Sequence, residues 1–585
     1  MLRRKNPRLL DCSFKTKLTI FIERNEFVMS SIPQTNQKLT PEQIELLQFP
    51  SLPHYLKEEL LTIDLSKKFE RNYQAQIYKR MLKKLQDQTI AENVAGISGK
   101  KPIPNLLPFN HMSYLLSYVY TFRSIYLSAS SPMNRRVTLG VYLDYSFYDA
   151  NLIGVYQTNY EDIQFLLRGF LADYTIQQIK EIFDKIKREA LRVYATENRH
   201  LFAVRNGIYN QLTHQLEAFH ENYVTLVKIP VDYKENPMNP LIIDPKDGYE
   251  WNVDQWIYEL ANEDTDINTL IWQVIADCLQ PSYTRKRSIW FYSDKGNNGK
   301  GTLGQLIKNL LGVGNYASLS VAEFKHEFKK AGLIGVAANI ADENDVNAYI
   351  DSVKDYKASV TGDDIIINIK HEQPIRFQFK GTNIQMMNGL PKTKDTSGSF
   401  YRRLLIVPFV KSFTNNGERP LIKEDYIHRK DVLEYVLFKA LHMEFTEFIQ
   451  PDVSNKFIAQ YQEMNNPIIQ YWDEFAEQFT WDLLPTQFLY DLYVQWSKRN
   501  NPNGKEMSRR TFVDELKLVI ETDPDWECKF ERNENTRTGD FMKEDEPLIS
   551  EFNLTGWMSD YNGSDAKKKR DFPRKAMYRG LKRKM

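Results

Sequence analysis

The sequence predicts an α/β protein with a mainly helical N-terminal region and a small C-terminal helical domain. Between about residues 289 and 410, apolar strand-like segments alternate with helical ones, and a glycine-rich loop joins one such strand to a helix. Residues 467–530 read as a compact group of helices ending in a strand. The chain of 585 residues is too long for one ordinary domain, so we expect roughly three or four domains of about 150 residues each.

Composition excludes several classes of protein. The three cysteines lie far apart and form no C-x-x-C pair, which argues against a zinc ribbon or a disulfide scaffold and favours a reducing cytoplasm. No apolar run reaches the ~20 residues of a membrane span. Charged residues interrupt the N-terminal apolar segment, which argues against a signal peptide. We therefore expect a soluble, cytoplasmic protein with no membrane partner.

Charge is unevenly distributed, although the formal net charge is only +1. Residues 1–28 hold seven basic and three acidic side chains, and residues 567–585 hold ten and one. The 538 residues between them hold 60 basic and 72 acidic side chains. An acidic body with basic ends suggests a polyanionic partner that contacts the ends of the chain.

The chain divides at shifts in composition and periodicity. Residues 137–156 predict a strand or hairpin, and residues 176–196 predict an amphipathic helix. Residues 1–28 precede a second methionine and are either a basic arm or an upstream extension. The predicted domains are 1–28, 29–160 (accessory), 161–250 (preceding the α/β core), 251–415 (α/β core), 416–466 (helical connector), 467–540 (C-terminal domain) and 541–585 (basic tail).

The most specific motif is the glycine-rich loop that follows the strand at residues 289–292 and precedes a helix at residues 303–311. Glycines let backbone N–H groups surround an anion, and the helix N-terminus adds a favourable dipole. Lys300 is placed to reach the β- and γ-phosphates of a nucleotide, and Thr302 to join a metal shell. The candidate ATP-binding residues are Gly296, Asn297, Asn298, Gly299, Lys300, Gly301 and Thr302.

This loop departs from the common phosphate-loop pattern at two positions. Asp294 stands where glycine is expected, and Gly301 stands where serine or threonine is expected. We expect Gly296 to supply the turn that Asp294 does not. A surface turn rich in glycine and asparagine is the alternative, but the strand before it and the helix after it favour a nucleotide site.

Two carboxylates follow the next long apolar segment. Residues 334–341 predict a buried parallel strand, and Asp342 and Glu343 come directly after it. Hydrolysis of a magnesium nucleotide needs one carboxylate to hold the metal's water shell and another to orient or deprotonate the attacking water. An apolar run ending in Asp-Glu is commonplace alone, but downstream of a phosphate loop it favours such a site.

Three further features follow in order. Residues 365–369 and 375–379 predict a hairpin with Lys370 and His371 at its tip, where a cation and an imidazole could grip a phosphate. A second apolar strand then ends at Asn388, placed to hydrogen-bond the attacking water or the γ-phosphate. Arg402 and Arg403 precede a further strand; they are either a surface patch or a finger inserted into a neighbouring subunit's site.

Taken together, these motifs resemble superfamily 3 helicases, most closely the poxvirus- and phage-satellite-type primase-helicases carried by phages, plasmids and pathogenicity islands. The resemblance covers about residues 165–415, and its motifs are specific collectively rather than singly. It implies an AAA+ P-loop ATPase core that assembles as a hexameric ring, hydrolyses ATP between subunits and moves along single-stranded DNA. The residues that carry it are 201–208, 231–233, 296–302, Asp342, Glu343, 361–363, Lys370, His371, Asn388, Arg402, Arg403 and 404–409.

The resemblance also implies roles for individual residues, with ATP and Mg²⁺ as cofactors. Lys300 and Thr302 contact phosphate and metal, Asp342 holds the metal, and Glu343 is the catalytic base. Asn388 senses the γ-phosphate, and the tip formed by Lys370 and His371 grips DNA. Either Arg402 or Arg403 is the finger in trans, with a slight preference for Arg402.

A primase site is not expected, although many relatives fuse a primase to the motor. Asp144 and Asp149 are the nearest pair of carboxylates, but they are five residues apart and no zinc-binding cysteines accompany them. A structural or docking role suits them better, and the N-terminal residues would regulate, oligomerise or recruit.

The C-terminal residues predict a winged-helix-like DNA-binding domain, with a packing domain as the alternative. Three helices are expected at 467–479, 486–499 and 508–520, with residues 526–537 folding back as a wing. The third helix begins with Arg509 and Arg510, where phosphates or base edges would be met. The basic residues after 567 add charge that neutralises phosphate, in a tail expected to be disordered without DNA.

Three function classes follow from these features. The first is an ATP-driven replicative helicase that binds single-stranded and duplex DNA, and that could also recognise a replication origin and host replication proteins. The second is a non-motor initiator that uses ATP as an assembly switch. The third is a P-loop ATPase acting on protein or small molecules, which the hairpin and the basic C-terminus disfavour.

Overall fold

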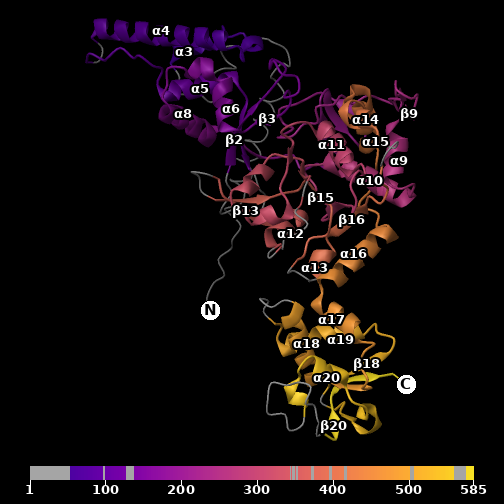
Figure 1. Cartoon of the computed structure of the whole chain (residues 1–585). Helices are drawn as coiled ribbons and strands as arrows, with labels where there is room; N and C mark the ends of the chain where they lie inside the picture. The colour runs from indigo at the N-terminus through magenta and orange to yellow at the C-terminus, as the bar shows by residue number, and fades with distance from the viewer. Residues whose placement is uncertain are drawn as a thin grey trace, which may run out of the picture.

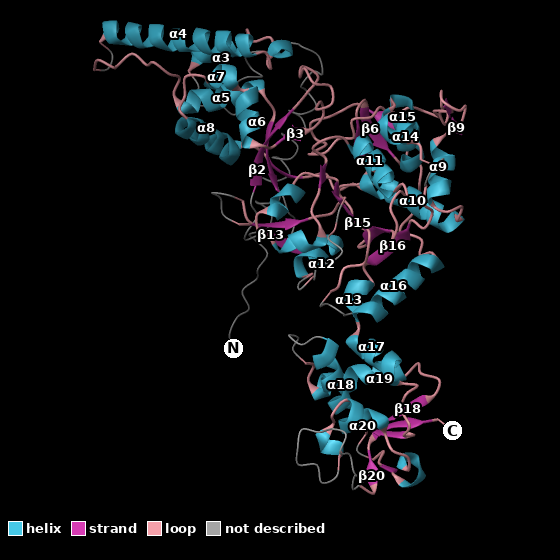
Figure 2. Cartoon of the chain, in the orientation of Figure 1, coloured by secondary structure: helices cyan, strands magenta, loops and turns pink. Residues whose placement is uncertain are grey.

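The structure is a computed structural model that forms three units along the chain (Figure 1). Its helices and strands are distinguished in Figure 2. It describes residues 53–96, 99–126, 137–342, 344, 350, 353–369, 374–393, 398–413, 418–500, 506–531, 533–558 and 575–584. Lys370, His371, Glu343 and residues 1–52 lie outside these ranges. Within the described residues, none of the helices has the length and apolar character that crossing a bilayer requires.

The N-terminal unit packs helices onto a small mixed sheet. Its strand order is β3-β2-β1-β4, with β1 antiparallel to β2 and parallel to β4. The strands are β1 (Phe122–Tyr126), β2 (Val137–Tyr142), β3 (Tyr156–Gln157) and β4 (Arg192–Tyr194). The helices are α3 (His54–Leu60), α4 (Arg71–Ala95), α5 (Phe109–Val119), α6 (Tyr160–Leu166), α7 (Arg168–Leu171) and α8 (Ile176–Glu189), with the short 3₁₀ helix η1 (Leu65–Lys67).

Two expectations for this unit are corrected. One buried apolar core joins residues 56–186, so the boundary expected at residue 160 cuts through a single unit. The helix expected at 176–196 begins at a capping box on Thr175 but ends at Glu189, because Ala190 is extended and the chain enters β4. The carboxylate of Asp144 pairs with the buried Lys68.

Short antiparallel strands and two helices lead from this unit to the main sheet. The strands are β5 (Leu201–Val204), β6 (Gly207–Asn210), β7 (Gln215–Glu217), β8 (Ile242–Ile243) and β9 (Glu250–Trp251). The helices are α9 (Val253–Leu260) and α10 (Thr265–Cys278), each opened by an Asn or Asp side chain that caps its first N–H groups. Both helices pack into the core that covers one face of the main sheet.

The main sheet is parallel, with strand order β11-β12-β15-β10-β16. Its side chains alternate between two cores: Ile289 and Phe291 face one, and Trp290 faces the other. Burial on both faces explains why these strands are continuously apolar. The strands are β10 (Ser288–Tyr292), β11 (Tyr316–Ala317), β12 (Ala338–Ala341), β15 (Thr382–Met387) and β16 (Leu404–Pro408).

Helices cover both faces of this sheet. One core contains residues of α10, α11 (Lys300–Leu311) and α15 (Lys430–Leu441). The other contains residues of α12 (Lys354–Thr361), α16 (Asp452–Asn465) and the hairpin β13–β14 (Asp364–Ile367, Ile375–Gln378). The remaining elements are α13 (Gly398–Tyr401), α14 (Pro420–Glu424), and the 3₁₀ helices η2 (Val321–Lys325), η3 (Lys329–Leu333) and η5 (Tyr426–His428).

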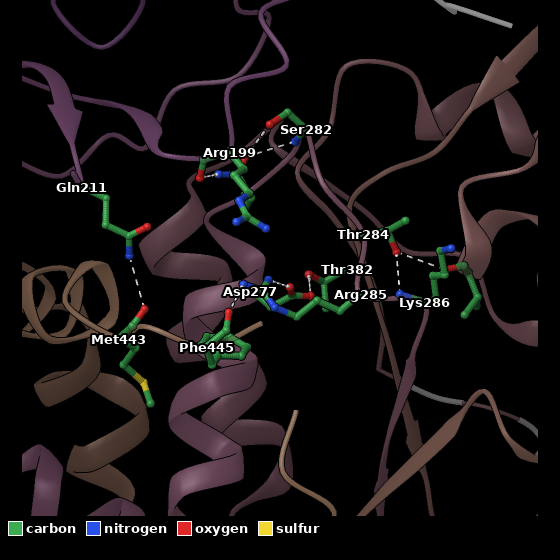
Figure 3. Close-up of polar contacts among 12 residues, drawn as sticks. Arg199, Gln211, Asp277, Ser282, Thr284, Arg285, Lys286, Thr382, Met443 and Phe445 are labelled. Carbon is green, nitrogen blue, oxygen red and sulfur yellow. Dashed lines mark hydrogen bonds and ion pairs between the residues drawn. The ribbon is translucent and has the colours of Figure 1, made fainter. Parts of the chain in front are cut away.

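A buried ion pair ties α10 to the amino end of the sheet (Figure 3). The guanidinium of Arg285 pairs with Asp277, whose other carboxylate oxygen accepts a hydrogen bond from Thr382 Oγ1 at 2.5 Å. Arg285 also stacks on the ring of Phe445, 3.9 Å from the ring centroid. Burial raises the pKa of Asp277, and the partners of its carboxylate oppose that shift. The Asp277–Arg285 pair thus connects α10 to the start of β15, at the amino edge of the sheet, which is opposite to the edge that carries the phosphate loop.

The C-terminal unit has its own apolar core and a three-stranded antiparallel sheet of order β17-β21-β18. The three expected helices are present as α17 (Pro467–Phe475), α18 (Thr486–Asn500) and α19 (Arg509–Ile520). The strands are β17 (Leu483–Pro485), β18 (Trp526–Lys529), β19 (Thr536–Arg537), β20 (Met577–Tyr578) and β21 (Gly580–Arg583), with α20 (Pro547–Glu551), η6 (Gly539–Met542) and η7 (Thr555–Trp557) between β19 and β20.

The end of the chain differs from the expected disordered tail. β21 is the central strand of this sheet, Leu581 is fully buried in its core, and Arg583 stacks on the ring of Trp526. A boundary at residue 540 would therefore remove the strand that joins β17 to β18. The basic cluster from Lys567 to Arg570 lies outside the described residues.

Candidate functional site at the carboxyl edge of the sheet

The predicted phosphate loop connects β10 to α11 and is shaped by two residues with positive φ. These are Asn297 (φ 53°) and Gly299 (φ 76°). The turn that we expected at Gly296 is therefore made by Asn297 and Gly299, one and three residues further along the chain. A Cβ at Gly299 would approach Leu260 Cδ2 to 2.4 Å, whereas a Cβ at Gly301 would meet nothing within 4 Å. Gly299 is thus favoured by its positive φ, and a larger residue would also have to displace the end of the Leu260 side chain. Gly301 leaves open space at the start of the helix.

Residues that follow β16 brace this loop from outside. The N–H of Phe413 donates to the carbonyl of Asn297 at 2.6 Å, and the hydroxyl of Ser412 donates to the carbonyl of Gly296 at 3.2 Å. Inside the loop, Asn298 Oδ1 accepts the N–H of Lys300 at 3.1 Å. The N–H groups of Gly301 and Thr302 lie in the first turn of α11, where a helix has no internal acceptor for them. They are therefore available to an anion.

Lys300 reaches across the sheet edge from the start of α11. Its Nζ donates to the carbonyl of Met387 at 2.7 Å and to Asn388 Oδ1 at 2.6 Å. Burial lowers the pKa of Lys300 to about 8. The structure thus brings together two predicted site residues that are far apart in sequence, a buried cation and the amide at the end of β15.

Asp342 lies at the same edge, directly after β12. The register pairs Ala341 with Gln385 on β15 and Tyr292 with Met387, so the carboxyl ends of the three strands are neighbours. The carboxylate of Asp342 pairs with Lys308 of α11 and is otherwise largely exposed. Glu343, the expected catalytic base, lies outside the described residues.

The donors at this edge suit a hard cation held mainly by a nucleotide. Asp342 offers a carboxylate and Thr302 a half-buried hydroxyl, both oxygen ligands of the kind that Mg²⁺ prefers. Within the described part of the chain, no three His, Cys, Asp or Glu side chains form a metal cluster. A magnesium ion here would therefore complete its shell with phosphate oxygens and water.

The predicted hairpin is present, and its stem is regular. β13 and β14 pair from Asp364 with Gln378 to Ile367 with Ile375. Its inward residues, such as Ile365 and Phe377, are buried against the sheet's second core. The tip with Lys370 and His371 lies outside the described residues, so its proposed contact with DNA stays a prediction.

The two arginines before β16 differ in their surroundings. Arg402 is exposed, whereas Arg403 is half-buried and donates to the carbonyl of Ser399. The backbone carbonyl of Arg402 accepts a hydrogen bond from Arg287, which fixes the backbone while its side chain points to solvent. Of the two side chains, that of Arg402 is the more exposed.

In the C-terminal unit, α19 presents the predicted cations. Ser508 caps the helix by accepting the N–H of Thr511 at 3.2 Å. Arg509 and Arg510 follow in the exposed first turn, and Phe512 begins the buried face of the helix. The cap fixes where α19 begins, and burial of Phe512, Leu516 and Ile520 leaves the two arginines on the exposed side of the helix.

Sequence reasoning missed Lys308, Phe413 and Leu260. Lys308 follows Lys300 on α11 by about two helical turns, but nothing local marks it as the partner of Asp342. Phe413 and Leu260 meet the loop through packing between segments distant in sequence. Only the arrangement of α11 over β12, and of the chain after β16 over the loop, reveals these contacts.

Comparison with known proteins gives two family matches. Residues 291–403 match a family of unknown function (DUF5906), and residues 463–554 match a family described as poxvirus D5 protein-like. The first runs from the end of β10 to the residue before β16, and the second covers most of the C-terminal unit. The second match supports, at the level of the family, the expected relation to poxvirus-type replication proteins of the primase-helicase kind.

Other comparisons are weaker. No curated protein sequence matches the chain. One apo structure of the NrS-1 C-terminal region shares 12% identity with a TM-score of 0.37, and covers 70% of this chain and 84% of that one. Another shares 12% identity with a TM-score of 0.36, and covers 68% and 95%. These scores are too low to support a fold or a function.

Proposed function

We propose that the protein is an ATP-hydrolysing DNA helicase of superfamily 3, which unwinds DNA during replication of a phage, plasmid or genomic island. The observation that carries the proposal is the position of Lys300. Its ammonium is held by Asn388 and by the carbonyl of Met387, at an edge where a helix N-terminus and Asp342 also converge. A cation, free N–H groups and a carboxylate so arranged suit a magnesium nucleotide.

Each residue at this edge has a proposed role. On binding, Lys300 exchanges its two oxygen acceptors for phosphate oxygens, while the N–H groups of Gly301 and Thr302 receive the same anion. Asn388, released from Lys300, can then hydrogen-bond the γ-phosphate or the attacking water. Mg²⁺, when bound beside Asp342 and Thr302, would neutralise charge on the phosphates. Glu343 would take the proton from water.

Hydrolysis between subunits is the second part of the proposal. Arg402 is exposed and lies just before the amino end of β16. The phosphate loop follows the carboxyl end of β10, and β10 runs parallel to β16. Arg402 and the phosphate loop of the same subunit therefore lie at opposite edges of the sheet. Arg402 would thus act on the nucleotide of a neighbouring copy. A closed homo-oligomer, with the hexamer expected from the resemblance, satisfies every site in this way.

DNA contacts are proposed at two places. The hairpin β13–β14 would carry Lys370 and His371 against single-stranded DNA. The C-terminal unit would bind duplex DNA, at an origin or beside it, as a winged helix. Three features support this: the helix order α17, α18, α19, the sheet order β17-β21-β18, and the exposed Arg509 and Arg510 at the start of α19.

The test is ATP hydrolysis by the full chain with and without single-stranded DNA. A translocating motor hydrolyses ATP faster when its track is present, so we expect the rate of ATP hydrolysis to rise when single-stranded DNA is added. An initiator that uses ATP only as an assembly switch would hydrolyse it at the same rate in both conditions. Unchanged hydrolysis would therefore favour that alternative and contradict the motor.

The hairpin is tested separately by the double substitution Lys370→Ala with His371→Ala. We expect strand displacement to be lost while ATP continues to be hydrolysed, because the proposal gives these residues a role in gripping DNA and none in binding nucleotide. Lys354→Ala, which removes an exposed cation at the start of α12, is the control and should displace strands normally. Normal displacement by the double variant would show that the hairpin does not grip DNA.

A further inference from the structure

An unexpected ion pair occupies the carboxylate assigned to the metal. Lys308 lies on the buried face of α11, and its Nζ pairs with Asp342 Oδ2. The two partners are unequally exposed: the side chain of Lys308 is 9% exposed and that of Asp342 is 56% exposed. The ammonium also lies 5.4 Å from the ring centroid of Tyr316, on β11. Lys308 is thus held in place by the protein, whereas Asp342 can turn toward solvent.

This asymmetry determines what happens when a cation arrives. A metal ion that uses Asp342 must compete with an ammonium already paired to it, and must tolerate that positive charge nearby. Because Lys308 is buried on α11, it cannot move far away, and the movement has to come from Asp342. The pair therefore opposes metal binding in the nucleotide-free protein.

We propose that Lys308 is a positioning residue that holds Asp342 against α11 until a magnesium nucleotide draws the carboxylate away. The inference rests on the proposed nucleotide site. It adds a specific consequence: nucleotide without metal binds with the Lys308–Asp342 pair intact, whereas metal-bound nucleotide binds only after the pair opens. Lys308 thereby raises the Mg²⁺ concentration at which the site is filled.

The substitution Lys308→Met tests this cleanly. Methionine has a similar length and suits a buried position. The Asp342 carboxylate left behind is mostly exposed, so water can solvate it and the fold should survive. The readout is binding of a fluorescent ATP analogue to the full-length protein, measured in EDTA and then across a Mg²⁺ titration.

We expect Lys308→Met to lower the half-saturating Mg²⁺ concentration by about tenfold, the effect of removing one neighbouring like charge. Its affinity for the analogue in EDTA should not increase, because the substitution removes a positive charge and leaves the Asp342 carboxylate unpaired. Lys308→Arg, which keeps the charge, should restore the wild-type threshold. Lys330→Met removes another buried lysine, the partner of Asp355, on the opposite face of the sheet and should leave the threshold unchanged.

Failure of the inference and failure of the nucleotide site give different results. If the wild-type protein binds no analogue in either condition, the nucleotide site itself is wrong. If it binds normally and Lys308→Met has an unchanged or higher Mg²⁺ threshold, Lys308 does not compete for Asp342. A shift of equal size in Lys330→Met would also contradict the inference, because it would show a general effect of losing a buried lysine.

Discussion

The cations of the main sheet edge and those of the C-terminal unit are presented in opposite ways. Lys300 and Lys308 are buried, and each is tied to an oxygen at the end of a neighbouring strand. Arg509 and Arg510 are exposed in the first turn of α19. A buried, pre-positioned cation suits a small anion that must be held in one geometry, whereas exposed guanidinium groups suit a long polyanion. The near-neutral net charge hides these two uses.

Removing the buried cation should have the largest effect. Lys300→Ala removes the ammonium that hydrogen-bonds Asn388 and the carbonyl of Met387 and that we propose binds phosphate. We expect ATP hydrolysis to fall by at least about 100-fold. Lys295→Ala, in an exposed position of the same loop, is the matched control and should retain most activity. Equal losses of ATP hydrolysis in both variants would mean that the buried Lys300 has no greater role in the site than the exposed Lys295.

The exposed Arg402 should have the next largest effect, and only in the assembled protein. We expect Arg402→Ala to slow hydrolysis by about 100-fold, the loss typical of removing one group that stabilises charge in the transition state, with little change in nucleotide affinity. Mixing Lys300→Ala with Arg402→Ala should recover part of the activity, because some interfaces then combine an intact Lys300 with an intact Arg402. A mixture as inactive as its components would argue against a finger acting in trans.

The C-terminal cations should contribute a smaller and salt-dependent effect. Replacing Arg509 and Arg510 with alanine should weaken duplex binding by about tenfold and reduce the slope of log affinity against log salt by about 2. Replacing Lys180 and Arg188, two exposed cations on α8, removes the same charge from the other end of the chain. If both double variants weaken binding equally, net charge rather than α19 governs affinity.

Changing pH should give the smallest effect. The pKa of Lys300 is lowered to about 8, so the free protein loses this cation as pH rises through that value. Phosphate binds the protonated form, and nucleotide affinity should therefore be nearly constant below pH 7 and fall about fourfold between pH 7 and pH 8.5. Affinity measured calorimetrically across this range should also reveal proton uptake. An affinity that rises with pH would contradict a cationic contact.

Sequence patterns over a few neighbouring residues correctly predicted individual strands and helices. The apolar strand before the loop, the hairpin stem, the strand that ends before Asn388 and the helix α19 were all predicted, because each depends on neighbouring residues. The strand order of the main sheet was not readable, since it depends on how the crossovers pack. Neither was the Lys308–Asp342 pair, which forms only where α11 crosses β12.

The chain's end shows why a basic composition can mislead. The segment Gly580–Arg583 is rich in charge and follows a polar stretch, which favoured a disordered tail. In the structure it pairs with two strands at once, and its one large apolar residue, Leu581, fills the core. Arg583 is held by Trp526 and by Asp482 Oδ1 at 2.7 Å. Long-range pairing of this kind leaves almost no local signal.

The most direct test of the central claim follows ATP hydrolysis and strand displacement together on one forked duplex. If nucleotide chemistry at the β10–α11 edge drives movement on DNA, the wild-type protein should displace a strand with ATP and hydrolyse it faster when the fork is added. It should displace no strand with a non-hydrolysable analogue, and Lys300→Ala should do neither. Displacement with the analogue, or displacement by Lys300→Ala equal to that of the wild type, would contradict the account.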